Sequence, residues 1–353
     1  MPIELKFIST KVETEKNIRT FCHAYKKGFE KYELKTSGST GLPKSIFFSK
    51  IQMQNSALST IERLKLVEGS IALICLNTNY IAGKMMLVRC IEANMKAVVV
   101  EPSAYPFDDL PDKIKIDFAA FVPLQLTKIL ERNSKKDIEI LNQIKTIIVG
   151  GEQISNSLLN QLKNLKADVF HTFGMTETIS HFALKHISAN KAYFELLNGV
   201  EIGVNGNNCL KVRSNVTNNI WIQSNDIVQL IFEGNKVAGF EWIGRIDNVI
   251  NSGGVKINVE TVENLVQNVF FNMNFTGNFF VYKKPDPTFT EKVVLFIEGK
   301  NLGENFTKEL MEMIKNAAEN KYWVPKEIMF INTFTFTNSG KIDRIKTSEN
   351  ASS

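Results

Sequence analysis

The segment KTSGSTGLPKSI at residues 35–46 gathers hydroxyls, glycines and one lysine in a single short stretch. Its backbone N–H groups, its hydroxyls and the ammonium of Lys44 can together hold an anion. The common nucleotide loop G-x-x-x-x-G-K-[S/T] does not fit, because only two residues separate Gly38 from Gly41 and Pro43 precedes the lysine. Composition alone is equally consistent with a solvated turn.

Polar residues also follow two strand-like runs. IIVGGEQI ends an apolar run at Gly150 and Gly151, and HTFGMTET places Thr176 and Glu177 beyond another. Ligands of open α/β sheets bind beyond the carboxyl ends of strands, so both segments are predicted to line a site. Three later segments carry polar residues as well: WIQSNDIV with Asp226, GRIDNVINSGG with Arg245 and Asp247, and TNSGKIDR with Lys341.

Short apolar strands and amphipathic helices alternate between about residues 70 and 180, and these elements must position the segments. Strands are predicted at IALICL, KAVVVEP, DFAAFVP, KTIIVGG and ADVFHTF. Helices are predicted at YIAGKMMLVRCIEA, LQLTKILER and ISNSLLNQLKNL, the last with Ser155 near its start. Continuous apolar strands separated by helices predict a mainly parallel sheet with helices on both faces.

The pattern changes twice towards the C-terminus. After residue 180, short β runs alternate with turns rich in Asn and Gly, which predicts an antiparallel sheet or a small barrel, with Asp226 between two runs. From about residue 247, helices and strands form an α+β unit of ordinary domain size. We therefore expect an α/β protein with a large N-terminal domain at 1–246, including a β-rich subdomain at about 181–246, and a small mobile C-terminal domain at 247–353.

Bulk properties exclude several classes of protein. The chain has 353 residues and a net charge of +5, with basic and acidic residues interspersed, so no nucleic-acid partner is expected. Its four cysteines lack metal-ligand spacing and are expected to be buried reduced thiols. The start resembles no signal peptide and no apolar run approaches a membrane span, so we expect a cytoplasmic protein without stable membrane insertion. The oligomeric state is left open, with a homodimer as one option.

Taken in order from residue 36 to 344, these motifs resemble the adenylate-forming superfamily of acyl-CoA synthetases, peptide-synthetase adenylation domains and luciferases. Within it, TSGSTGLPK, YIAGKMM, GMTETISHFALK, GRIDNVINSGGVKI and YWVPKEI resemble the o-succinylbenzoate–CoA ligases of menaquinone biosynthesis, in a short form. The pattern departs from most members in three places. Only 35 residues precede Thr36, whereas most members have a long N-terminal lobe there. SND at 224–226 occupies the place of the usual T-G-D. NTNY, ending at Tyr80, occupies the place of the usual aromatic or histidine motif.

The resemblance implies a two-step reaction. A small-molecule carboxylic acid attacks the α-phosphorus of ATP, held with Mg²⁺, and gives acyl-AMP and pyrophosphate; the thiol of CoA then displaces AMP to give the thioester. Such a displacement needs positioning and charge neutralisation more than covalent help. Two alternatives stay open: a ligase for another aryl or fatty acid or for a carrier-protein thiol, and a nucleotide-binding protein without catalysis.

The resemblance also assigns roles at the phosphates. Thr176 would contact the α-phosphate, and Glu177 would bind Mg²⁺, which prefers carboxylate oxygen. Lys341 would bridge the attacking carboxylate and the α-phosphate and stabilise charge in the transition state. The alternatives are a helix-capping acid at 177 and a solvated tail lysine at 341. The residues assigned to the β- and γ-phosphates are Thr36, Ser37, Gly38, Ser39, Thr40, Gly41 and Lys44.

For the nucleoside, Phe173 would stack on adenine and Asp226 would accept both ribose hydroxyls. Plain core packing and a turn acid are the respective alternatives. Asp247 would be the hinge between the lobes. The remaining ATP contacts are assigned to Gly151, Glu152, Gly174 and Arg245.

CoA and the acid complete the implied site. Gly253 and Gly254 would let backbone approach the pantetheine arm of CoA, with an ordinary β-turn as the alternative. o-Succinylbenzoate has two carboxylates, of which only the succinyl one is activated, so the other needs a cation or convergent donors. Helical spacing places Tyr80 and Lys84 on one face, and solvated lysine and arginine side chains are the alternative. The acid-binding candidates are Tyr80, Lys84, Arg89, Ser180 and His181.

Overall fold

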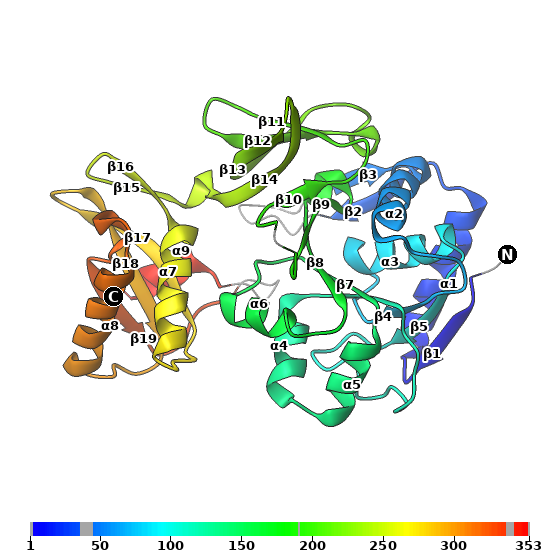
Figure 1. Cartoon of the computed structure of the whole chain (residues 1–353), viewed down its shortest axis with the longest axis horizontal. Helices are drawn as coiled ribbons and strands as arrows, with labels where there is room; N and C mark the ends of the chain where they lie inside the picture. The colour runs from blue at the N-terminus through cyan, green and yellow to red at the C-terminus, as the bar shows by residue number, and fades with distance from the viewer. Residues whose placement is uncertain (1–2, 36–44, 190, 337–341, 352–353) are drawn as a thin grey trace.

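The computed structural model describes residues 3–35, 45–189, 191–336 and 342–351. The predicted phosphate loop at 36–44 and Lys341 lie outside these residues. The elements form two groups, seen on opposite sides of Figure 1: β1–β14 with α1–α6, and β15–β19 with α7–α9. The α/β fold class predicted from the sequence is confirmed.

Parallel strands form one half of a twelve-stranded sheet. They are short apolar runs, and all residues of β6 are buried, as expected for strands covered on both faces. In order across the sheet they are β1 (Leu5–Ile8), β5 (Lys96–Val100), β4 (Ile71–Ile74), β6 (Phe118–Phe121), β7 (Thr146–Val149) and β8 (Asp168–Gly174).

Helices cover both faces of these strands, because successive strand residues point to opposite sides. Ala72 and Ile74 of β4 belong to one core cluster and Leu73 to the other. Ser155, predicted to lie near the start of a helix, is the N-cap residue of α6 and accepts a hydrogen bond from the Leu158 backbone N–H. The first cluster is covered by α1 (Val12–Lys27), α2 (Lys50–Leu64) and α3 (Ile81–Glu92), the second by α4 (Pro123–Arg132), α5 (Lys135–Gln143) and α6 (Asn156–Leu162) (Figure 1).

Antiparallel strands continue the same sheet rather than forming a sheet or barrel of their own. The junction is the antiparallel pairing of β8 with β9 (His181–His186), whose other edge pairs with β10 (Phe194–Leu196). The two β runs predicted on either side of Asp226 form one long strand, β13 (Ile222–Glu233). Asp226 is part of this strand and pairs with Arg245 of the neighbouring strand. The sheet then ends with β14 (Lys236–Arg245), β13, β12 (Cys209–Arg213) and β11 (Glu201–Val204).

A second sheet carries the C-terminal part of the chain. It contains β15 (Val249–Ser252), β16 (Val255–Asn258), β17 (Phe279–Asp286), β18 (Thr290–Glu298) and β19 (Glu327–Ile331). Its helices are α7 (Val259–Asn272), α8 (Glu304–Ala317) and α9 (Arg344–Asn350). β14 ends at Arg245 and the second sheet begins at Val249, while the boundary at 246/247 stays a prediction.

Smaller features complete the fold. The hairpin of β2 (Tyr32–Lys35) and β3 (Ser45–Phe48) flanks residues 36–44 in the sequence. Single 3₁₀ turns occur at η1 (Thr176–Thr178), η2 (Asn215–Thr217), η3 (Ile246–Asn248) and η4 (Lys321–Trp323). All four cysteines are buried free thiols, as predicted. Within the described ranges, no helix has both the length and the apolar character needed to cross a bilayer.

Candidate functional site

The turn after β8 carries the two residues predicted to face the α-phosphate and the metal. Thr176 and Glu177 form η1 directly beyond the carboxyl end of β8. Glu177 is exposed, and its carboxylate makes no hydrogen bond or ion pair with any described residue. One free carboxylate combined with substrate phosphates is an ordinary Mg²⁺ site, so the donor fits this ion. Among the described residues, no group of three or more His, Cys, Asp or Glu could hold a metal without the substrate.

The same turn contains a strained residue. Ile179 has φ 66° and ψ −50°, and the Ser180 N–H donates to the Thr178 carbonyl at 2.7 Å. This is a γ-turn of the rare form, which is costly for a β-branched residue and persists only where the surroundings impose it. Burial of the Ile179 side chain, 1% exposed, supplies that constraint. The chain therefore reverses sharply between Glu177 and Ser180.

Gly174 makes this reversal sterically possible. It lies opposite His181, and a Cβ built on it would approach the Ser180 carbonyl oxygen to 2.4 Å. Backbone cannot move away from such a contact as a flexible side chain can, so a residue larger than glycine would displace the start of β9. The structure thus gives Gly174 a steric role, while its contact with ATP stays a prediction.

Arg89 is the most unusual charged residue of the region. It lies on α3 and is only 2% exposed. Its Nη2 donates to the Ser180 Oγ at 2.8 Å, its Nε has no partner, and no carboxylate of the described residues pairs with it. Burial lowers the pKa of Arg89 to about 10. A buried guanidinium held by one neutral hydroxyl lacks the counter-charge that such a group needs.

His181 lies next to this guanidinium. It is 7% exposed, with Nδ1 at 3.4 Å from the Ser180 Oγ and Nε2 at 3.0 Å from the Thr60 Oγ1 of α2. Burial, followed by the charge of Arg89, lowers the pKa of His181 well below its usual value, so the imidazole is neutral. The structure therefore brings together three of the predicted acid-binding residues, Arg89, Ser180 and His181. Thr60, which the sequence did not predict, also belongs to this group.

Lys84 lies elsewhere on the same helix. Its Nζ donates to the Thr78 carbonyl at 2.5 Å and faces the rings of Phe21 and Tyr32 at 5.9 and 5.4 Å. Burial lowers the pKa of Lys84 to about 8. The alternative of solvated side chains is thus wrong for both cations, since Lys84 is 6% exposed and Arg89 is more buried still.

The predicted shared face of Tyr80 and Lys84 is wrong. Tyr80 is the N-cap residue of α3, with extended backbone at φ −100° and ψ 161°, so helical spacing does not apply to it. Its side chain is 67% exposed, whereas Lys84 is buried. Lys84 and Arg89 also contact different neighbours, so α3 does not present the acid-binding candidates as one group.

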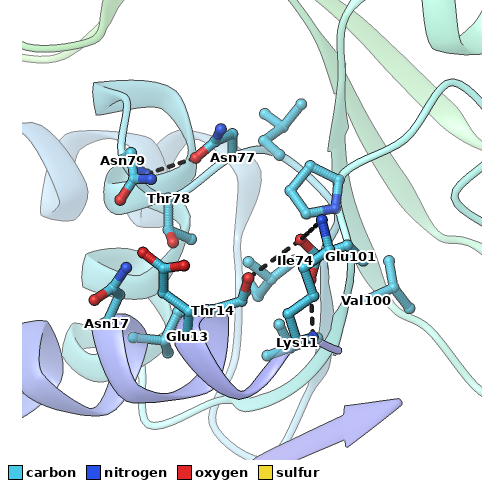
Figure 2. Close-up of a pocket in the computed structure, with 14 residues that line it drawn as sticks. Lys11, Glu13, Thr14, Asn17, Ile74, Asn77, Thr78, Asn79, Val100 and Glu101 are labelled. Atoms are coloured by element: carbon cyan, nitrogen blue, oxygen red, sulfur yellow. Dashed lines mark hydrogen bonds and ion pairs between the residues drawn. The ribbon is translucent and has the colours of Figure 1, made fainter. Parts of the chain in front are cut away.

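A polar crevice is lined in part by the loop whose Thr78 carbonyl accepts the Lys84 hydrogen bond. Asn77, Thr78 and Asn79 face Glu13 and Asn17 of α1 across it, beyond the carboxyl ends of β4 and β5 (Figure 2). Its volume is about 190 Å³, and none of the predicted site residues lines it. The crevice is therefore distinct from the group around Arg89.

The predicted ribose residues form a second polar group. Asp226 Oδ1 accepts from Trp242 Nε1 at 3.0 Å and lies 3.7 Å from Arg245 Nη1. Asp247 accepts from Asn225 Nδ2 at 3.0 Å and from Arg245 Nη2 at 2.8 Å. Arg245 thus links the predicted ribose acid to the predicted hinge residue. Trp242 and Asn225 were not anticipated, because nothing in their local sequence marks them.

The adenine candidates are less distinctive. The Phe173 ring packs against Phe182, Phe194 and Phe240 at 5.7, 5.3 and 5.0 Å, within the core of the antiparallel strands. This is the packing alternative, and stacking on adenine stays a prediction. Gly151 has φ 91°, which favours glycine, and the carbonyl of Glu152 lies 3.4 Å from His171 Nε2.

Gly253 and Gly254 form the two-residue turn between β15 and β16. Their φ values are 59° and 83°, and Ser252 pairs with Val255 across the turn. A hairpin of this kind requires positive φ at both central residues, which explains the glycines without a ligand. The β-turn alternative is confirmed, and a contact with CoA stays a prediction.

The chain is similar to known proteins in sequence and in structure. A family model described as AMP-binding enzyme matches residues 34–225. The 2-succinylbenzoate–CoA ligase of Lactococcus lactis is 25% identical over 334 residues, which are 88% of this chain and 69% of that protein.

Two solved structures are similar over most of the chain. An acyl-CoA synthetase (AMP-forming)/AMP-acid ligase II-like protein from Dyadobacter fermentans is 37% identical with a TM-score of 0.63, covering 97% of this chain and 95% of that one. The o-succinylbenzoate CoA synthetase of Bacillus subtilis, in complex with its acyl-adenylate intermediate, has a TM-score of 0.75 at 20% identity and covers 89% and 68%. At 20% identity, the similarity to the Bacillus subtilis enzyme shows a shared fold and no more.

Proposed function

The chain belongs to the family of AMP-binding enzymes, and from this premise we propose that it is an ATP-dependent acid–CoA ligase acting on o-succinylbenzoate. The succinyl carboxylate attacks the α-phosphorus of ATP, and the bond to the β-phosphate oxygen breaks to release pyrophosphate. The thiol of CoA, losing its proton, then attacks the acyl carbon of the adenylate. AMP leaves, and o-succinylbenzoyl-CoA is formed.

The buried and unpaired guanidinium of Arg89 carries this proposal. A cation without a carboxylate partner is stabilised by an anionic ligand, and a guanidinium matches the planar geometry of a carboxylate. The ring carboxylate of o-succinylbenzoate is an anion that is bound but not activated. We assign it to Arg89 and Ser180, with His181 beside them. Lys84, which lies between aromatic rings, would hold the loop at 77–79 in place through its hydrogen bond to the Thr78 carbonyl.

The nucleotide would bind across the carboxyl ends of the parallel strands. Glu177 would hold Mg²⁺, which supplies neutralisation of charge on the phosphates, and Thr176 would contact the α-phosphate. Asp226 and Arg245 would hold the ribose, with Trp242 orienting the Asp226 carboxylate. The predicted loop at 36–44 would hold the β- and γ-phosphates, and the adenine would lie near Gly151, Glu152, Phe173 and Gly174.

The C-terminal elements would act as a lid that carries Lys341. We propose the division into domains at 1–246 and 247–353, with Asp247 as the hinge and Gly253 and Gly254 near the arm of CoA. The Lactococcus lactis and Bacillus subtilis relatives bear the names of o-succinylbenzoate enzymes, which supports both the acid and the use of CoA. As a biosynthetic ligase, the enzyme would act in the cytoplasm.

Acid-dependent exchange of pyrophosphate into ATP tests the proposal. Purified protein is given Mg²⁺, ATP, labelled pyrophosphate and, one at a time, o-succinylbenzoate, benzoate, a fatty acid and succinate. We expect exchange with o-succinylbenzoate, followed by thioester formation when CoA is added. Exchange with another acid alone would overturn the substrate assignment, and no exchange with any acid would overturn the activity.

A further inference from the structure

A series of polar side chains connects Arg89 of α3 to Thr60 of α2 through the turn before β9 and the first residue of β9. Arg89 Nη2 lies 2.8 Å from Ser180 Oγ, and Ser180 Oγ lies 3.4 Å from His181 Nδ1. His181 Nε2 lies 3.0 Å from Thr60 Oγ1, whose hydroxyl donates to the Ser56 carbonyl at 3.1 Å. Thr60 is 0% exposed, so no solvent competes for its hydroxyl. These side chains come from α3, from the turn before β9, from the first residue of β9 and from α2.

The chemistry of each group fixes the direction of this series. Arginine donates and never accepts, so the Ser180 Oγ accepts from Arg89 and directs its own hydrogen towards His181 Nδ1. The Thr60 hydrogen goes to the Ser56 carbonyl, so the Thr60 Oγ1 must accept from His181 Nε2. The imidazole therefore carries its single hydrogen on Nε2. This assignment agrees with a neutral ring, whose pKa is lowered by burial.

The strained turn at Ile179 allows this series of hydrogen-bonded side chains to form. Successive side chains of a regular strand point to opposite faces, so Ser180 and His181 could not both join one network within β9. Because the γ-turn ends at Ser180 and β9 begins at His181, the side chains of both residues take part in the hydrogen-bonded series. A local cost in backbone conformation at Ile179 is thus matched by a specific arrangement of polar groups.

We propose that Thr60 and His181 are positioning residues that orient the Ser180 hydroxyl and, through it, the guanidinium of Arg89 that receives the acid. The inference rests on the proposed function and deepens it, since it names the residues that set recognition of the second carboxylate. Thr60 touches no substrate in this account. It acts through the tautomer of His181.

Substitutions at Thr60 test the inference. Thr60→Val keeps the shape of the side chain and removes the hydroxyl, whereas Thr60→Ser keeps the hydroxyl. The control is Ser59→Ala on the same helix. This variant removes a hydroxyl that donates to the Asn55 carbonyl and takes no part in the hydrogen-bonded series from Arg89 to Thr60. In the exchange assay we expect Thr60→Val to raise the KM for o-succinylbenzoate about tenfold while the KM for ATP and kcat stay nearly constant. Thr60→Ser and Ser59→Ala should both match the unaltered protein.

A spectroscopic measurement separates failure of this inference from failure of the proposed function. Nitrogen-15 NMR of the four histidines, with His181 assigned by the His181→Gln variant, reports which ring nitrogen carries the hydrogen. We expect the Nε2–H tautomer in the unaltered protein and a shift towards Nδ1–H in Thr60→Val. An Nδ1–H tautomer in the unaltered protein would overturn the inference whatever the enzyme does. Equal KM values for Thr60→Val and Thr60→Ser would also overturn it, even if the ligase activity is confirmed.

Discussion

Arg89 combines burial with the lack of a carboxylate partner among the described residues, and the proposed function would supply the missing anion. It is 2% exposed and has a hydroxyl, rather than a carboxylate, as its partner. Removing such an uncompensated charge from a protein interior is often neutral or stabilising. A buried charge of this kind is expected to lower the stability of the ligand-free protein, and the anionic ligand that we propose would offset that cost.

The Arg89→Met variant should therefore be more stable than the unaltered protein without ligand. We expect its Tm to rise by about 2 °C or more, because the buried charge is replaced by an apolar chain of similar length. The control is Arg63→Met, which removes the partly exposed ion pair with Glu195 and should change Tm by about 1 °C or less. Differential scanning calorimetry measures both values. A Tm for Arg89→Met below that of Arg63→Met would contradict this account.

Lys84 predicts a pH dependence of stability. Burial lowers its pKa from 10.5 to about 8 in the folded protein. Between these two values the unfolded chain binds the proton and the folded chain does not, so stability rises with pH across this window. We expect the free energy of unfolding of the unaltered protein, relative to Lys84→Met, to increase from pH 8 to pH 10.5. Urea titrations at several pH values test this, and parallel curves for the two proteins would contradict it.

The sequence identified some of these residues and not their partners. Arg89, Ser180 and His181 were named because they lie in or beside recognisable motifs. Thr60 contacts His181 across 121 positions of sequence, and no local pattern marks such a pair. The predicted helix begins at Tyr80, whereas α3 begins at Ile81, so the helical spacing expected between Tyr80 and Lys84 is absent.

At the scale of elements, the β8–β9 junction decides where the site residues lie. The missing side chain of Gly174 and the γ-turn at Ile179 together let β9 return directly beside β8. Glu177 is thereby left exposed at the tip of the turn, while His181 is buried beneath it.

Substitution of Gly174 should disturb this junction. A Cβ at position 174 would approach the backbone at Ser180 to 2.4 Å, so Gly174→Ala must displace the start of β9. We expect a loss of about 1–3 kcal/mol in the free energy of unfolding and a rise in the KM for the acid. Gly206→Ala is the control, because a Cβ there meets no atom within 4 Å. Denaturant unfolding and the exchange assay together test this, and identical behaviour of both variants would argue against the steric role.

The elements themselves were predictable where the apolar pattern was continuous. The strands at 71–74, 96–100 and 118–121 were expected as short buried runs, and the structure confirms them. That the strands after residue 180 extend the first sheet was not predictable. The register of β8 against β9 depends on a close backbone contact at Gly174, which an alternating pattern does not reveal.

At the scale of the molecule, polar contacts at the predicted hinge and between α6 and α7 link the two groups of elements. Asp247 binds Arg245 and Asn225, and Asn248 donates to Glu260 of α7 at 2.6 Å. Asn156 of α6 donates to Asn268 of α7 at 2.6 Å. Three of these four polar contacts are exposed and one is partly buried, and such contacts can break and re-form when domains move.

The proposed lid gives Lys341 a role in one half-reaction. We expect Lys341→Ala to abolish formation of acyl-AMP from acid and ATP, because charge at the α-phosphate is no longer neutralised. Thioester formation from supplied acyl-AMP and CoA should remain largely intact. Lys346→Ala, which removes an exposed lysine of α9 paired with Asp343, is the control and should retain both steps. Rapid-quench assays of the two half-reactions test this, and equal loss of both would refute the role.

The central claim is that a buried cation recognises the second carboxylate of the acid. It is tested most directly by comparing o-succinylbenzoate with 3-benzoylpropionate, the same acid without its ring carboxylate, in the unaltered protein and in Arg89→Met. We predict that kcat/KM in the unaltered protein favours o-succinylbenzoate by about 100-fold and that this preference falls to about threefold or less in the variant. The same preference in both proteins would contradict the claim.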